Sequence, residues 1–133
     1  MESKQVFKKF EDFAVKQDER NQFGKFDFDD FPTISKQFKE FYKEYNPIDV
    51  EIDLGKNGVL QFFSGKELLD IQQEYGLTDY IVFGELEGDP IALKEGKIFL
   101  AVHGTGQFEF KMINDDFVCF LEELIEEEIS IDT

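Results

Sequence analysis

The chain is poor in the residues that supply nucleophilic catalysis and structural metal binding, with one cysteine and one histidine among 133 residues. A lone Cys119 cannot form an internal disulfide, and it fits a reducing compartment. A structural zinc site needs about four cysteine or histidine ligands. A Ser-His-Asp or Cys-His site would have to use His103, with Cys119 as the candidate thiol. Cys119 lies in an apolar-periodic segment where cysteine is usually buried. We therefore predict no catalytic residue, no metal and no cofactor.

Cationic residues are also scarce, since 14 Lys and Arg face 30 Asp and Glu for a net charge of −16. A general phosphate-backbone binder needs a cationic stripe, so nucleic acid is excluded as a partner. Docking on anionic lipid is disfavoured for the same reason. No apolar run approaches the length of about 18 residues that a membrane span requires. Residues 1–10 lack the apolar stretch of a signal peptide, so we expect a cytoplasmic protein.

Linkers, repeats and low-complexity tracts are absent, which predicts one domain over residues 1–133. The apolar fraction is 41%, and it includes 17 phenylalanines and no tryptophan. That composition opposes disorder and favours a phenylalanine-packed interior. No feature of the sequence predicts the oligomeric state.

Four segments have the apolar spacing of an amphipathic helix. The second follows Pro32 and ends at Asn46-Pro47. The third opens with a capping box over residues 64–67 and is expected to stop at Gly76. The fourth is expected to be capped by Asn114 or Asp115. The four apolar faces are Val6, Phe7, Phe10, Phe13 and Ala14; Ile34, Phe38, Phe41, Tyr42 and Tyr45; Leu68, Leu69, Ile71 and Tyr75; and Phe117, Phe120, Leu121, Leu124 and Ile125.

Between the second and the last helix the apolar period changes to two, which indicates strands. The expected strands cover residues 49–54, 58–63, 80–85, 90–93, 97–103 and 107–112. Residues 87–89 and 94–96 supply turns of hairpin length. Consecutive strands joined by short turns favour an antiparallel or mixed sheet. The sequence therefore predicts a single α+β domain whose sheet is flanked by N- and C-terminal helices.

The negative charge is concentrated in the second half of the chain. Residues 1–66 hold 11 cationic and 13 anionic side chains, whereas residues 67–133 hold 3 and 17. This asymmetry predicts an electronegative face that steers a basic partner. The alternative is that acidic residues keep a phenylalanine-rich protein soluble. Asp49, Glu51 and Asp53 would also project from one strand face, either as a row for docking cations or as an ordinary solvent face.

The order of several short motifs is distinctive. Phe31-Pro32 precedes an aromatic-rich helix that ends at Tyr45-Asn46, and a Phe-Gly pair (Phe83, Gly84) precedes Gly88-Asp89-Pro90. A strand over residues 97–103 and a closing helix with Asp116-Phe117, Phe120 and Leu121 follow. This layout resembles the SUKH superfamily over residues 31–126, with residues 1–30 as a variable N-terminal helix and loop. Pro47 departs from the glycine that the family commonly has after the asparagine.

The resemblance implies an immunity protein that binds and neutralises a cognate toxin, often a nuclease, without catalysis. An alternative is a regulatory or scaffold module that binds an endogenous partner. An enzyme that uses carboxylates is a third possibility, but no nucleophile–base pair or metal set is visible. Local chemistry gives the candidate partner-binding residues Asp79, Glu85, Glu87, Asp89 and Glu109. The candidate turn residues are Phe83, Gly84, Gly88, Asp89 and Pro90, where Asp89 could set the turn instead of touching a partner.

Overall fold

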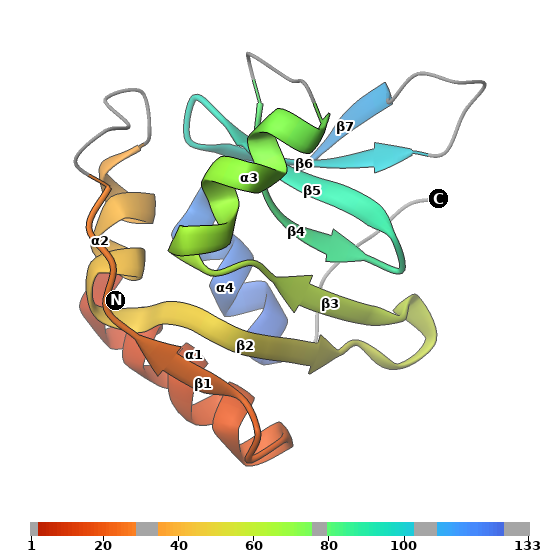
Figure 1. Cartoon of the computed structure of the whole chain (residues 1–133). Helices are drawn as coiled ribbons and strands as arrows, with labels where there is room; N and C mark the ends of the chain where they lie inside the picture. The colour runs from red at the N-terminus through yellow and green to blue at the C-terminus, as the bar shows by residue number, and fades with distance from the viewer. Residues whose placement is uncertain (1–2, 29–34, 76–79, 103–108, 127–133) are drawn as a thin grey trace.

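The computed structural model describes residues 3–28, 35–75, 80–102 and 109–126 of the chain (Figure 1). Within these ranges four α-helices accompany one seven-stranded sheet. Every pairing in the sheet is antiparallel, and the spatial order of the strands is their order in the chain. The predicted α+β fold with flanking helices is confirmed.

The sheet is a meander because each strand pairs with the strands that precede and follow it in the chain. The strands are β1 (Gln22–Gly24), β2 (Asn46–Asp53), β3 (Val59–Phe62), β4 (Ile81–Leu86), β5 (Asp89–Lys94), β6 (Lys97–Val102) and β7 (Glu109–Asn114). Two residues with positive φ connect β4 to β5, Glu87 at 49° and Gly88 at 88°. Glu95 and Gly96 do the same between β5 and β6. Two-residue turns of this kind match the right-handed twist of a hairpin, so the predicted turns are confirmed.

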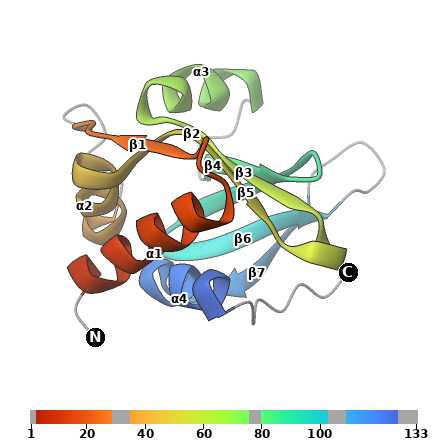
Figure 2. The ribbon, with the colours of Figure 1, turned by 90° about the horizontal axis from the view of Figure 1, so that it is seen from below.

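The helices lie on both faces of the sheet, but unequally. They are α1 (Ser3–Gln17), α2 (Lys36–Tyr45), α3 (Gly65–Tyr75) and α4 (Phe117–Glu126). Figure 2 shows α3 on one side of the sheet and α1 and α4 on the other. Helix α2 packs with α1 and α4. We call the side covered by α1, α2 and α4 the helical face, and the side that carries α3 the outer face.

The core fills the space between the sheet and the helices α1, α2 and α4, and it is built largely from phenylalanine, as expected. Phe83 of β4 is completely buried. Its ring centroid lies 5.5 Å from that of Phe38, 5.8 Å from Phe117 and 6.1 Å from Phe120, all in edge-to-face contact. Such pairs add about 0.5–1.5 kcal/mol each beyond the burial of their apolar area. Strand β4 is therefore anchored to both α2 and α4 through one side chain.

The helix starts follow local hydrogen bonding. The predicted capping box exists, since Ser64 Oγ accepts from the N–H of Glu67 at 3.2 Å and Glu67 Oε1 accepts from the N–H of Ser64 at 3.1 Å. Helix α2 starts at Lys36, with Ser35 as its N-cap.

The predicted cap of α4 was wrong. Asp116 caps it by accepting from the N–H of Cys119 at 3.0 Å. Asn114 instead ends β7, and its side chain accepts from the N–H of Asp116. Residues 29–34 and 76–79, which include the predicted Ile34, Pro32 and Gly76, lie outside the described ranges.

Two strand predictions need correction. Strand β1, which has three residues and pairs with the start of β2, was not predicted. Phe83 and Gly84 lie inside β4, which confirms the strand expected over residues 80–85, and their further assignment as turn residues is wrong because they form a shift in register against β5. Gly84 is required by close packing, because a Cβ there would lie 2.5 Å from the carbonyl oxygen of Gln61 on β3. Asp89 and Pro90 belong to β5, which leaves Gly88 as a true turn residue.

Candidate protein-binding surface

The register of the sheet gathers carboxylates on the outer face. Val50 and Ile52 of β2 are buried in the core, and the residues that alternate with them are exposed. The predicted alternation of Asp49, Glu51 and Asp53 on one strand face is thereby confirmed. Glu51 pairs with Gln61 of β3, and Gln61 pairs with Glu85 of β4. Since neighbouring strands lie about 4.8 Å apart, Glu51 and Glu85 lie about 10 Å apart on the same side of the sheet.

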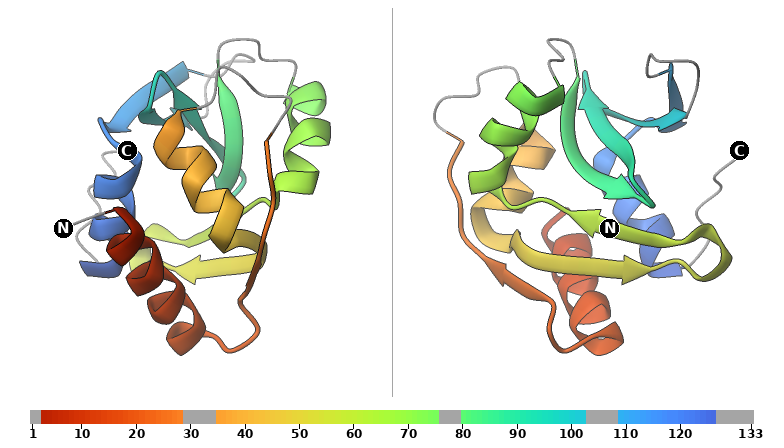
Figure 3. Two further views of the ribbon diagram at one scale, coloured as in Figure 1. Left: turned by 90° about the vertical axis from the view of Figure 1, so that its left-hand side faces the viewer. Right: turned by 45° about the vertical axis from the view of Figure 1, so that its right-hand side comes forward.

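Glu87 extends this group at the end of the sheet. Its Oε1 accepts from the N–H of Val59 at 2.8 Å, and Val59 is the partner of Asp53 in the ladder. Its side chain also lies over Gly58, where a Cβ would come within 2.3 Å of Glu87 Cγ. In Figure 3 the paired strands β2 and β3 run beyond the end of α3. We call the resulting group the acidic sheet face: Asp49, Glu51, Asp53, Glu85 and Glu87.

Five ion pairs of the described residues lie on α1, on α2 and near β1. They join Lys8 to Glu11 and Asp12 on α1, Lys36 to Glu40 on α2, Lys25 to Glu44, and Arg20 to Asp18. None of these pairs involves Asp49, Glu51, Asp53 or Glu87. Asp49, Glu51 and Asp53 repel one another along β2, and Glu85 adds to this field from about 10 Å away across β3, which is close to the screening length at physiological salt. A partner that supplies cations would relieve this repulsion.

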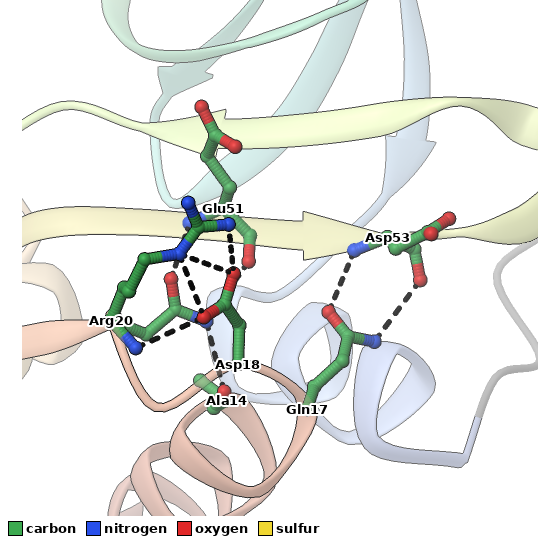
Figure 4. A network of polar contacts seen from close by, with 7 residues as sticks. Ala14, Gln17, Asp18, Arg20, Glu51 and Asp53 are labelled. Carbon is green, nitrogen blue, oxygen red and sulfur yellow. Dashed lines mark hydrogen bonds and ion pairs between the residues drawn. The ribbon is translucent and has the colours of Figure 1, made fainter.

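Arg20 lies at the border of the acidic sheet face (Figure 4). Its guanidinium donates to Asp18, at 2.9 Å from Nη2, and this hydrogen bond is the main cause of the raised pKa of Arg20. The charges of Glu51 and Asp49 raise that pKa further. The same contact lowers the pKa of the Asp18 carboxyl. These residues, with Asn21, line a surface depression of about 130 Å³.

Two side-chain amides hold the backbone of β2 beneath the acidic row. Strand β1 covers only the start of β2, so the backbone groups of Glu51 and Asp53 need other partners. Asn21 donates to the carbonyl of Glu51 at 3.0 Å and accepts from its N–H at 2.9 Å. Gln17 does the same for Asp53, at 3.1 and 2.7 Å (Figure 4). Each amide imitates a paired strand, which fixes the backbone and closes part of an open sheet edge.

The structure brings together only part of the predicted site. Glu85 and Glu87 lie in the acidic sheet face, where they meet the β2 carboxylates. Asp89 pairs with the buried Leu86, and Glu109 pairs with Val102, so alternation directs both toward the helical side of the sheet. Asp79 lies outside the described residues. The β2 carboxylates were noticed in the sequence but were not joined to Glu85, because that step requires the register of β2, β3 and β4.

The predicted electronegative face does not coincide with the second half of the chain. That half contains α3 and α4, which lie on opposite sides of the sheet (Figure 2). The acids of α4 adjoin the lysine-rich α1, and Lys9 lines a shallow groove with Glu122 and Glu126. The charge of α4 is therefore partly offset, whereas three of the five carboxylates in the acidic sheet face come from the first half.

Cys119 was expected to be buried, and this was wrong. Its side chain is exposed in the first turn of α4, whose buried face is formed by Phe117, Phe120, Leu121 and Leu124. Partial burial and the nearby charge of Asp116 raise the pKa of its thiol, so its nucleophilic thiolate form is disfavoured. His103 lies outside the described residues.

Among the described residues, no three side chains of histidine, cysteine, aspartate or glutamate are grouped so that they could hold a metal ion. None of the described helices has the length and apolar character needed to cross a membrane.

Comparison with protein-family models, with curated proteins and with solved structures finds no match for this chain. The resemblance to the SUKH superfamily therefore stays a prediction from the motifs quoted above.

Proposed function

We propose that this protein is a cytoplasmic immunity protein of the SUKH type that binds and neutralises a basic toxin, with no catalysis of its own. The observation that supports the proposal best is the acidic sheet face. It joins Asp49, Glu51 and Asp53 to Glu85 and Glu87 across three adjacent strands.

The electrostatics suit the inhibition of a nuclease. An enzyme that binds the phosphate backbone presents a cationic surface to it. An anionic protein can occupy that surface in place of the substrate. A field of one sign also accelerates the encounter of two proteins, by about 10- to 1,000-fold at low salt. The expected partner is therefore a basic protein, with no direct binding to nucleic acid.

Co-expression with candidate toxin domains tests the proposal. The protein should restore growth to cells that carry the cognate toxin. A triple variant, Glu51→Lys with Asp53→Lys and Glu85→Lys, should lose protection and associate at least about tenfold more slowly with the purified toxin at low salt. The matched control reverses three acids on α1 and α2 (Asp12→Lys, Glu40→Lys and Glu44→Lys). It makes the same change in net charge and should still protect.

Two results would contradict the proposal. If both triple variants protected equally well, the acidic sheet face would not be the contact. Affinity capture from the native cell addresses the regulatory alternative. Recovery of a housekeeping protein through this face, with no toxin domain, would assign the chain to regulation or scaffolding instead.

A further inference from the structure

The outer face also carries a group of apolar side chains on β5–β7. The rings of Tyr80 and Phe110 stack with their centroids 4.1 Å apart, and Phe99 meets Tyr80 edge to face at 5.3 Å. Lys94 Nζ lies 5.0 Å from the centroid of the Tyr80 ring. Met112, the ladder partner of Phe99, is 50% exposed. We call Tyr80, Phe99, Phe110 and Met112 the apolar sheet face.

The ladder makes the two groups neighbours. Glu51, Gln61, Glu85 and Pro90 follow one another across β2 to β5 as direct partners. Ile91 pairs with Leu100, so the row continues from Pro90 to Ala101 of β6, whose partner on β7 is Phe110. At about 4.8 Å per strand, Glu85 and Phe110 are about 14 Å apart on one side of the sheet.

Helix α3 leaves this surface open. It is held near the start of β4, where Gln72 donates to the carbonyl of Val82 and accepts from its N–H, at 2.9 and 2.8 Å. It packs against β2 and β4. The exposed Met112 lies three strands away on β7. Carboxylates and exposed apolar atoms thus lie side by side on the part of the outer face beyond α3.

We propose, on the basis of the function proposed above, that the two groups form one composite interface. Its partner is a basic protein whose contact surface carries an apolar side chain for the apolar sheet face, with lysines or arginines on one flank for the acidic sheet face. An apolar centre beside a charged border is the usual anatomy of a protein interface. The charged border provides specificity and association rate, and the apolar part slows dissociation.

Charge complementarity selects this occupant over two others. A second copy of the chain would bring its own carboxylates toward the same row, and like charges across an interface cost several kcal/mol. An anionic lipid surface would be repelled by the acidic sheet face. A basic protein gains from both parts of the surface at once.

A peptide selection tests the composite interface without knowledge of the toxin. Random peptides of about 12 residues, displayed on phage, are selected on the intact protein. The enriched peptides should combine lysine or arginine with an aromatic or large aliphatic residue, and synthetic copies should bind more weakly as salt rises. Met112→Glu should lower their affinity by at least about tenfold. Val15→Glu is the control, because Val15 on α1 is 41% exposed and lies outside the proposed interface.

The combined triple variant Glu51→Lys, Asp53→Lys and Glu85→Lys should mainly slow association of the same peptides, whereas Met112→Glu should mainly speed dissociation. Equal affinities for Met112→Glu and Val15→Glu would overturn the composite interface. So would enrichment of basic peptides with no apolar residue. A dimer that Met112→Glu dissociates in sedimentation, or binding to phosphatidylserine vesicles, would assign the surface to a second copy or to lipid instead.

These outcomes separate the interface from the function. Peptides that bind as expected, together with no rescue by any toxin pairing, would leave the composite interface in place and reject the immunity role. If the Met112→Glu variant still rescued cells from the toxin and still bound the peptides normally, the immunity role would stand and the composite interface would be rejected.

Discussion

The two sides of the sheet differ in what their side chains do. On the helical face Phe38, Phe83 and Phe117 are fully buried and in mutual contact. On the outer face beyond α3, a group of carboxylates lies beside a group of partly exposed aromatic and aliphatic side chains. Burial of large rings provides the free energy of folding. The fold therefore depends on the helical face, and the outer face is free to be specialised for recognition.

The α1–α2 layer and the acidic sheet face also differ in the sign of their charge, although the three acids of α4 balance the lysines over the helices of the helical face as a whole. Helices α1 and α2 together carry seven lysines and four acidic residues. The acidic sheet face carries five carboxylates. A cationic partner of such a chain would be attracted to the outer face and not to the α1–α2 layer. The distribution of charge therefore follows the elements of the fold more closely than the two halves of the sequence.

The largest expected contrast is between two apolar truncations. Phe83→Ala removes a ring that contacts α2 and α4, and it should lower the free energy of unfolding by about 3–5 kcal/mol. Met112→Ala removes a half-exposed side chain from β7, and it should cost less than about 1 kcal/mol. Urea unfolding followed by circular dichroism measures both. Similar losses for the two variants would contradict the assignment of stability to the helical face.

A smaller contrast concerns the amides that support the acidic row. Asn21→Ala leaves backbone groups of Ala14 and Glu51 without their partner, and Asn21 is only 5% exposed. The expected loss of unfolding free energy is about 1–3 kcal/mol. Gln17→Ala removes an analogous pair of bonds to Asp53 at an exposed position, where water can replace them. It should cost clearly less, and an equal cost would show that burial does not matter here.

The sequence was sufficient for several features that are decided locally, although the equally local cap of α4 is Asp116 and not the predicted Asn114 or Asp115. The capping box at Ser64 and Glu67 and the turn at Glu87-Gly88 depend on residues within four positions of each other, and both were predicted. The apolar faces of the helices follow from periodicity alone. Gly84 shows the limit. The Phe-Gly dipeptide favoured a turn at Gly84. The glycine is needed instead because the carbonyl oxygen of Gln61, 23 positions earlier in the chain, lies close to it.

The candidate surface lies further beyond the reach of the sequence. Glu51 and Glu85 are brought onto one row by the pairing of three strands, and a shift of one residue would turn either side chain to the other face. The bulge at Phe83 changes that alternation within β4. The same limit explains Cys119 and the misplaced Asp89 and Glu109, because each depends on which side of an element faces the core. The apolar pattern of a sequence predicts whether a segment is a helix or a strand. The register of a strand is set by the strands that pair with it.

The smallest expected effect tests how dry the helical face is. Tyr42 is completely buried, and its hydroxyl donates to the carbonyl of Phe63 at 2.7 Å. Tyr42→Phe should cost about 1 kcal/mol at neutral pH. Burial, with a contribution from the charge of Glu67, raises the pKa of Tyr42 well above 10. In the unfolded chain a tyrosine ionises near pH 10. Above that pH the unfolded state binds fewer protons than the folded state, so the stability of the natural chain falls as pH rises.

The phenylalanine variant lacks this contribution. Its difference from the natural chain should shrink by about 1.4 kcal/mol for each pH unit above 10, and the two should become equally stable near pH 11. Urea unfolding of both proteins at several pH values measures this, because the difference cancels every other titrating group. A difference that stays constant between pH 9 and about 11.5 would mean that Tyr42 ionises equally well in the folded protein. Water would then reach the Tyr42 hydroxyl, and the contrast between a dry core and an exposed outer face of the sheet would fail.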